Sequence, residues 1–179
     1  MRRPHLEGLP PLDLPARYSL RTYLSGDDAA WAEIMNTGIG IGWTAERCRQ
    51  QLTSMPQFRP ERLFFAVVAN DPSSEPVGSA CAWTPDAGET NRGYVHMVCV
   101  RPEHRGHHLG YWLTLATLHR FRDNGFQTVI LNTDDYRLPA IHEYLQLGFE
   151  PELTHPNHGE RWDRVFEALK QARERTDQR

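Results

Sequence analysis

The segment from residue 94 to residue 121 constrains the fold of this chain more than any other. Residues 94–100 alternate β-branched and apolar side chains as a strand does, and Pro102 lacks the N–H donor that a longer ladder would need. Residues 109–121 repeat apolar side chains at helical spacing. We therefore expect a strand that passes into a helix through one short loop.

The loop between this strand and this helix combines basic residues with glycines. The first N–H groups of a helix have no partners within it, and they point into such a loop beside the positive end of the helix dipole. Phosphate is the natural ligand of this geometry. Arg105, and His104, His107 or His108 when protonated, would add positive charge. The alternative interpretation is an ordinary polar connection without a ligand.

These residues resemble the central motif of the GNAT superfamily of acyl-CoA-dependent N-acetyltransferases, in which a strand ending in V-x-P precedes R/Q-x-x-G-x-G/A and a long helix. Arg105 and Gly110 occupy the first and last motif positions, whereas His108 stands where the family usually has glycine. A second signature of the family, A-x-x-x-Y-x-x-x-G-F, is reproduced from Ala140 to Phe149. Two motifs in the expected order are more specific than either alone.

The resemblance implies acetyl-CoA, a coenzyme A thioester, as the co-substrate. It places the pyrophosphate on the N–H groups of the loop, and the pantetheine arm and thioester along the main chain of the preceding strand, where one N–H acts as an oxyanion donor. The residues that it implies for coenzyme binding are Met97, Val98, Val100, Arg105, Gly106, His107, His108, Leu109, Gly110, Asn132 and Tyr144.

Acetyl transfer to an amine requires that the ammonium lose a proton and that the departing thiolate meet an acid. The resemblance implies the acid role for Tyr144. For the base we consider His96, which shares a strand face with Val98 and Val100 and carries an imidazole. Both residues could instead be structural, Tyr144 as a half-buried aromatic and His96 as a polar residue on an accessible face. Cys99 is close in sequence, but the resemblance implies direct attack without a covalent intermediate.

The hydrophobic patterns predict the element order β-α-α-β-β-β-α-β-α-β. Strands are expected at 18–24, 62–70, 77–84, 94–100, 128–133 and 149–153, and helices at about 27–36, 44–55, 109–124, 138–147 and 162–170. Short connections favour antiparallel pairs, whereas a helical crossover makes the fifth strand parallel to the fourth. The predicted fold class is α/β (α+β), a GNAT-like, mixed, mostly antiparallel central sheet of about six strands flanked by helices, with a C-terminal helix.

Proline content and periodicity suggest the domain boundaries. Residues 1–16 hold four of the thirteen prolines and show little periodicity, so we expect a proline-rich arm that lies on the surface or is disordered. Residues 17–170 are predicted to form a single N-acetyltransferase domain, followed by a charged tail at 171–179. The family usually closes its sheet with a seventh strand, and here a loop at 154–159 and a helix are expected in its place.

Charge and cysteine usage narrow the choice of partners. A formal net charge of -3 gives no general attraction to nucleic acid or to an anionic membrane, and no stretch approaches the ~18 apolar residues of a spanning helix. Neither partner is expected. The three cysteines lack C-x-x-C spacing, and the histidines of the loop lack a familiar set of metal ligands, so we expect no metal and a cytoplasmic protein.

Two other functions are compatible with these patterns. The chain could be a catalytically inactive acyl-CoA-binding or sensing module, or a phosphate-binding domain for another nucleotide, although no Walker lysine follows the glycines. The acceptor, a small-molecule or peptide amine, should contact the loops at 36–44 and 154–160, because loops carry most of the specificity in a fold. A homodimer is one compatible assembly.

Overall fold

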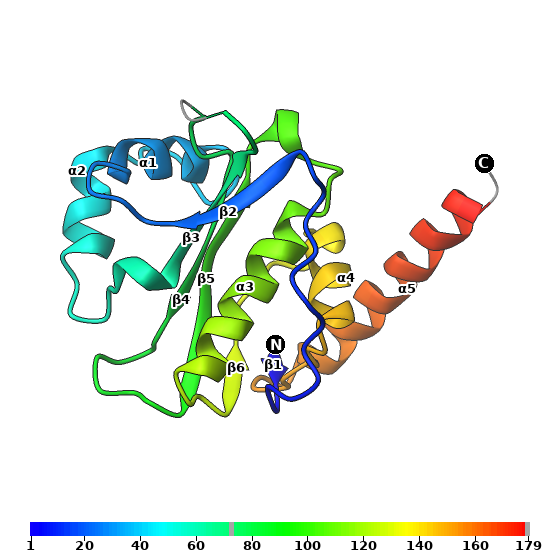
Figure 1. Cartoon of the computed structure of the whole chain (residues 1–179). Helices are drawn as coiled ribbons and strands as arrows, with labels where there is room; N and C mark the ends of the chain where they lie inside the picture. Colours follow the sequence, from blue (N-terminus) through cyan, green and yellow to red (C-terminus); the bar gives the residue numbers. More distant parts are fainter. Residues whose placement is uncertain (72–73, 178–179) are drawn as a thin grey trace.

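The structure is a computed structural model that describes residues 1–71 and 74–177. A six-stranded sheet lies at its centre (Figure 1). Its strand order is β1-β6-β5-β4-β3-β2, and only the β5–β6 pair is parallel. The strands are β1 (Arg2–Arg3), β2 (Tyr18–Thr22), β3 (Leu63–Val68), β4 (Gly78–Trp83), β5 (Arg92–Val100) and β6 (Thr128–Ile130). The predicted mixed, mostly antiparallel sheet is therefore confirmed.

Helices cover both faces of this sheet (Figure 1). They are α1 (Asp28–Asn36), α2 (Ala45–Cys48), α3 (Leu109–Asp123), α4 (Leu138–Gln146) and α5 (His158–Asp177), with a π-helical turn η1 (Arg49–Thr53) and 3-10 turns η2 (Pro60–Arg62) and η3 (Pro102–His104). On one face, Trp31 of α1 packs in a core cluster with Phe65. On the other, Leu118 of α3 packs in a second cluster with Val95. All six residues of β4 are buried between the layers.

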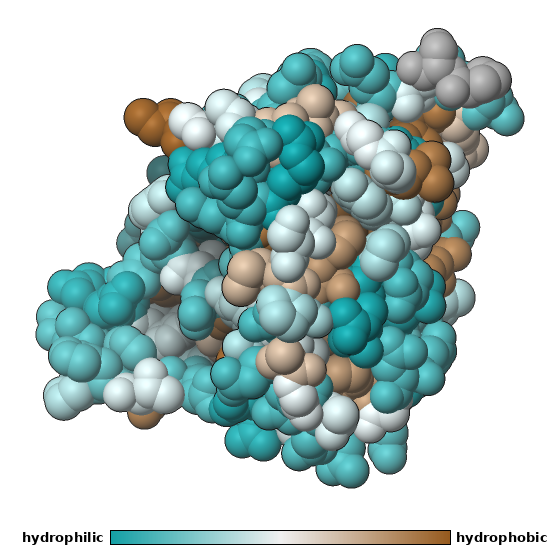
Figure 2. Space-filling view, turned by 90° about the vertical axis from the view of Figure 1, so that its left-hand side faces the viewer, coloured by the Kyte–Doolittle hydropathy of each residue, from teal (hydrophilic) through white to brown (hydrophobic). Residues whose placement is uncertain are grey.

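The side of the molecule formed by α1 and α2 is mostly hydrophilic at its surface, with smaller hydrophobic areas (Figure 2). The sequence of α1 explains this, because Trp31, Ile34 and Met35 recur at helical spacing and are fully buried, whereas Glu33 and Asn36 are exposed. The helix thus turns its apolar stripe toward the sheet.

The first residues of the segment predicted to be a surface arm join the sheet instead. Arg2 pairs with Ile130 and Arg3 with Val129, which makes β1 the edge strand beside β6. The guanidinium of Arg3 is buried and donates to the backbone carbonyl of Leu147. Periodicity could not reveal this strand, because it is two residues long, carries basic side chains and pairs with a distant part of the chain.

The predicted strand at 149–153 is wrong. In this segment only Glu150 forms a bridge, antiparallel to Arg2, so the N-terminal strand takes the edge position expected for it. Pro151 offers no N–H for a further ladder bond, which limits pairing here to one position. Within the described residues the sheet has no seventh strand.

The helix α5 begins earlier and ends later than predicted, and it extends away from the sheet (Figure 1). The predicted tail at 171–179 is therefore helical as far as it is described. Residues 178–179 of that tail, and residues 72–73 of the turn predicted at 71–76, lie outside the described residues.

A glycine in β5 allows α3 to pack closely on the sheet. A Cβ atom at Gly93 would lie 2.5 Å from Cε1 of Phe121, whose ring is fully buried near the end of α3. Because the interior is close-packed, the ring has little space into which it could move. The short distance between α3 and β5 therefore depends on the absence of a side chain here.

We expect Gly93→Ala to lower the free energy of unfolding by about 1–3 kcal/mol, because the added methyl group overpacks the core. Urea denaturation monitored by tryptophan fluorescence measures the change. Gly88→Ala is the matched control, since a Cβ atom there would have no neighbour within 4 Å. Equal stability of the two variants would contradict this account of the packing.

Candidate functional site

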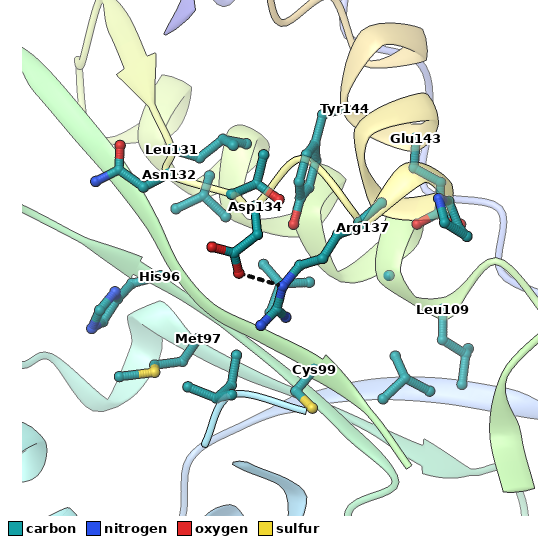
Figure 3. Close-up of a pocket in the computed structure, with 18 of the residues that line it drawn as sticks. His96, Met97, Cys99, Leu109, Leu131, Asn132, Asp134, Arg137, Glu143 and Tyr144 are labelled. Carbon is teal, nitrogen blue, oxygen red and sulfur yellow. Dashed lines mark hydrogen bonds and ion pairs between the residues drawn. The ribbon is translucent and has the colours of Figure 1, made fainter. Parts of the chain in front are cut away.

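A cavity of about 760 Å³ opens where β5 and β6 separate (Figure 3). The last residue pair between the two strands is Tyr94 with Ile130. Beyond this pair, residues 94–100 line one side and residues 131–134 the other, with the loop at 105–110 and residues of α4 completing the lining. In the described part of the chain, β5 past Tyr94 has no strand partner on this side, so its backbone can bind a ligand.

A β-bulge shapes the β5 wall of the cavity. The β4–β5 register shifts between Ser79 and Cys81, so that Met97 and Val98 together oppose a single residue of β4. Met97 has a φ of 54°, and the Ser79 hydroxyl donates to its carbonyl oxygen at 3.1 Å. Bulges bend a strand and redirect its groups, and they are frequent beside active sites. This bulge lies in the wall of the cavity.

The loop before α3 holds two residues in the left-handed region. Gly106 has a φ of 81°, and His108 has a φ of 54° and a ψ of 26°. Glycine adopts this conformation freely, whereas a histidine is strained in it. His108 is also the N-cap of α3, and its side chain makes no capping hydrogen bond. The helix therefore begins at the cavity, with Leu109 and Gly110 in its lining.

Arg105 connects this loop to two other elements. Its Nε donates to the carbonyl oxygen of Val100 at 3.1 Å, and one terminal nitrogen donates to that of Thr37 at 3.1 Å. These bonds hold the loop against the end of β5 and the residue that follows α1. The guanidinium contributes its positive charge at the lining of the cavity from this fixed position.

Tyr144 extends from α4 into the cavity, where its hydroxyl group points toward Arg137 and Asp134 (Figure 3). Burial raises the pKa of Tyr144 well above its ordinary value, and the charge of Glu143 adds to this effect, while Arg137 opposes it. The phenol therefore keeps its proton at neutral pH. It can donate a hydrogen bond or a proton to a group in the cavity.

His96 lies toward the other end of the cavity from Glu143 and Leu109, on the side of Asn132 (Figure 3). Its ring centroid is 5.1 Å from that of Tyr94, and burial lowers the pKa of its imidazole to about 4. The neutral ring can accept a hydrogen bond at physiological pH. It is a weaker base than an ordinary histidine.

The cavity brings together most of the residues that the sequence singled out. Those in its lining are His96, Met97, Val98, Val100, Arg105, Gly106, His108, Leu109, Gly110, Asn132 and Tyr144. His107 is absent from this lining, and its ring lies 5.5 Å from the ring of Tyr18. His104 turns the same way, with its Nδ1 3.0 Å from the hydroxyl oxygen of Tyr18.

Two carboxylates in the cavity were missed by sequence reasoning. Asp134 accepts a hydrogen bond from Nε of Arg137 at 2.9 Å, and Glu143 approaches the N-terminus of α3. The position of Asp134 just after a strand, and of Glu143 beside the motif tyrosine, could have drawn attention to them. Hydrophobic periodicity gives no information about such polar partners.

Two further possibilities, a metal-ion site and a membrane-spanning helix, are not found in residues 1–71 and 74–177. Over these ranges, no three His, Cys, Asp or Glu side chains are grouped so that they could hold a metal ion. None of the helices described is both long enough and apolar enough to cross a membrane.

The strain at His108 leads to a stability prediction. We expect His108→Gly to raise the free energy of unfolding by up to about 1 kcal/mol, because glycine relieves the left-handed conformation. Thermal and urea denaturation measure the change. His107→Gly is the control and should destabilise, since residue 107 is not left-handed and its ring packs near Tyr18. A destabilised His108→Gly variant would count against strain at this position.

The lowered pKa of His96 predicts a pH dependence of stability. Between pH 6.5 and about 4 the unfolded chain binds a proton at His96 that the folded chain does not, so the free energy of unfolding falls as the pH is lowered. His96→Gln should flatten this dependence by up to about 1.4 kcal/mol per pH unit. Denaturation curves from pH 4 to 8 test this, with the exposed His142→Gln as control. Parallel curves for wild type and His96→Gln would contradict it.

The chain is similar to curated proteins named mycothiol acetyltransferase. The mycothiol acetyltransferase of Rhodococcus erythropolis is 31% identical over 161 residues, which cover 84% of this chain and 52% of that protein. The chain spans about half the length of the curated relatives it matches.

Solved structures share the fold at lower sequence identity. A GCN5-related N-acetyltransferase from Sphaerobacter thermophilus superposes with a TM-score of 0.70 at 23% identity, over 84% of this chain and 47% of that one. Rv2747 from Mycobacterium tuberculosis, solved in complex with CoA, has a TM-score of 0.59 at 17% identity, over 83% of this chain and 81% of that one.

A family model describes the whole region that carries the cavity. The model of the Acetyltransferase (GNAT) family matches residues 29–149, from α1 through the motif strand, the loop, α3 and α4. This range is more than half of the chain and contains both sequence motifs. The chain therefore belongs to the GNAT acetyltransferase family.

Proposed function

We propose that this protein transfers the acetyl group of acetyl-CoA to the amine of an acceptor by direct attack in a ternary complex. The observation that carries the proposal is the arrangement of one cavity, in which the N-terminus of α3, the unpaired side of β5 and the Tyr144 hydroxyl meet. Membership of the GNAT family supports the same reaction.

The donor would lie along β5, with its phosphates at α3. The N-terminal N–H groups of a 15-residue helix favour an anion, and Leu109 and Gly110 place that end of α3 at the cavity. The amide-containing pantetheine arm can bond the free backbone of β5 much as an added strand would. This arrangement brings the thioester to the bulge at Met97 and Val98, opposite Tyr144.

The reaction forms a C–N bond and breaks the C–S bond of the thioester. A backbone N–H of β5 near the bulge would stabilise the negative charge that develops on the thioester oxygen. Tyr144 would donate its proton to the departing thiolate and recover one from solvent afterwards. The raised pKa of Tyr144 suits this role, because the phenol arrives protonated at neutral pH.

His96 would face the acceptor amine. With a pKa of about 4 its imidazole is neutral, so it can accept a hydrogen bond from the attacking nitrogen. Its weak basicity means that it would hold a proton only briefly and pass it to water. We therefore assign His96 the role of orienting the amine and passing its proton to water, and not the role of a strong base that retains the proton.

The acceptor is proposed to be a small molecule or peptide with a free amine. The relatives named mycothiol acetyltransferases make the acceptors of those enzymes the first compounds to test.

We also propose a cytoplasmic location, which the three buried, unpaired cysteines support. Light scattering coupled to size-exclusion chromatography tests whether the chain forms the homodimer that the sequence allows.

Thiol release tests the proposed function. The purified chain is incubated with acetyl-CoA and a panel of amines, amino acids and peptides, and free coenzyme A is detected with a thiol reagent. Acceptor-dependent release supports the reaction. Coenzyme binding without release by any acceptor would favour the acyl-CoA-binding module, and no calorimetric binding of millimolar acetyl-CoA would refute the proposal.

We expect Tyr144→Phe to lower kcat by about 10²–10⁴-fold while changing coenzyme affinity little, because an acid that protonates the thiolate acts mainly in the transition state. Steady-state kinetics and calorimetry measure the two quantities. The phenylalanine keeps the buried ring, so the melting temperature serves as the control for packing. Wild-type turnover in the variant would make Tyr144 a packing residue only.

A further inference from the structure

A carboxylate already occupies the end of α3 where the coenzyme phosphates would bind. Oε1 of Glu143 lies 3.5 Å from Nδ1 of His108, the N-cap residue. Its Oε2 lies 2.7 Å from the position that a Cβ atom would take at Gly110. The backbone of Tyr111, in the first turn of α3, stabilises the charged form of this carboxylate. Glycine at 110 thus makes room for Glu143 as well as for any ligand.

Glu143 reaches this position because of its place on α4. Ile141, two residues earlier, lines a second cavity together with Trp162 and Val165 of α5. Two residues along a helix correspond to a rotation of about 200°, so Glu143 lies on the opposite side, toward α3. Its side chain is only 20% exposed, and it lines the main cavity beside Tyr144. The side chain is therefore held at the site and is not a freely moving surface group.

We propose that Glu143 determines specificity at the donor site: its carboxylate is an internal anion that the pyrophosphate of acetyl-CoA displaces from the N-terminus of α3, while His108 passes from Glu143 to the phosphates. This inference rests on the proposed function. It follows because two anions compete for one set of N–H groups and one helix dipole. A donor without phosphates has no such competition.

The charged and titratable groups around Glu143 set the sign of the pH dependence. His108 faces it from the loop, Tyr144 neighbours it on α4, and α3 contributes the backbone of Tyr111, while α5 packs on the other side of α4. Burial raises the pKa of Glu143, and His108 and Tyr111 oppose that shift in part. Protonation of Glu143 removes the charge that competes with the phosphates. Coenzyme affinity should therefore fall as the pH rises.

Calorimetric titration of two ligands tests the proposal. Coenzyme A and pantetheine, which lacks the pyrophosphate, are titrated into wild type, Glu143→Gln and Glu143→Ala from pH 6 to pH 8. Glu103→Gln is the matched control, because Glu103 is an exposed carboxylate in the turn just before the loop and does not line the cavity. Melting temperatures establish whether each variant is folded. If Glu143→Gln does not fold, Glu143→Ala is used to test the proposal.

At pH 8 we expect the Glu143 variants to bind coenzyme A at least about tenfold more tightly than wild type, with a smaller difference at pH 6. Pantetheine affinity and the Glu103→Gln control should stay within about twofold of wild type. Equal coenzyme A affinity in wild type and both folded Glu143 variants at every pH would overturn the role of Glu143 alone. Failure of every protein to bind either ligand would instead overturn the proposed function.

Discussion

The site depends on how briefly β5 and β6 are paired. Their parallel ladder joins residues 92–94 to 128–130 and then stops, although β5 continues to Val100. Past Tyr94 the backbone of β5 is paired with β4 on one side only. Its unpaired side forms a wall of the cavity. A longer β6 would satisfy the same groups and leave no place for a ligand. The separation of two strands that are neighbours in the sheet therefore creates both the space and the hydrogen-bonding surface.

The start of α3 combines two demands that oppose each other. The turn into the helix needs left-handed residues, and one of them is His108, which adds a side chain where glycine would leave space. The N-terminal end of the helix favours an anion, and Glu143 supplies one from within the protein. Both side chains lie at the same end of α3, 3.5 Å apart and in the lining of the cavity. The character of this anion site thus depends on residues from two different elements.

The sequence predicted well those features that leave a periodic or positional signal. The strand at 94–100, the helix from Leu109 and the end of that helix near Gly125 are all found, because alternation, helical spacing and a left-handed glycine are local properties. The two-residue strand β1 left no such signal, and the segment at 149–153 suggested a strand that forms only one bridge. Glu143 was missed for a similar reason, since its importance comes from Gly110 and His108, which only the tertiary fold brings near.

The pairing of β1 has a mechanical consequence for the cavity. One wall, β5, is held by β4 through the centre of the sheet, whereas the other wall continues from a three-residue strand whose outer neighbour is β1. The N–H of Leu131, the first residue of that second wall, donates to the carbonyl of Met1 at 3.0 Å. The second wall is thus held by the three residue pairs of the β5–β6 ladder on one side and by β1 and Met1 on the other. Loss of β1 would leave that wall attached to the sheet through the β5–β6 ladder alone, while β5 would keep its pairing with β4.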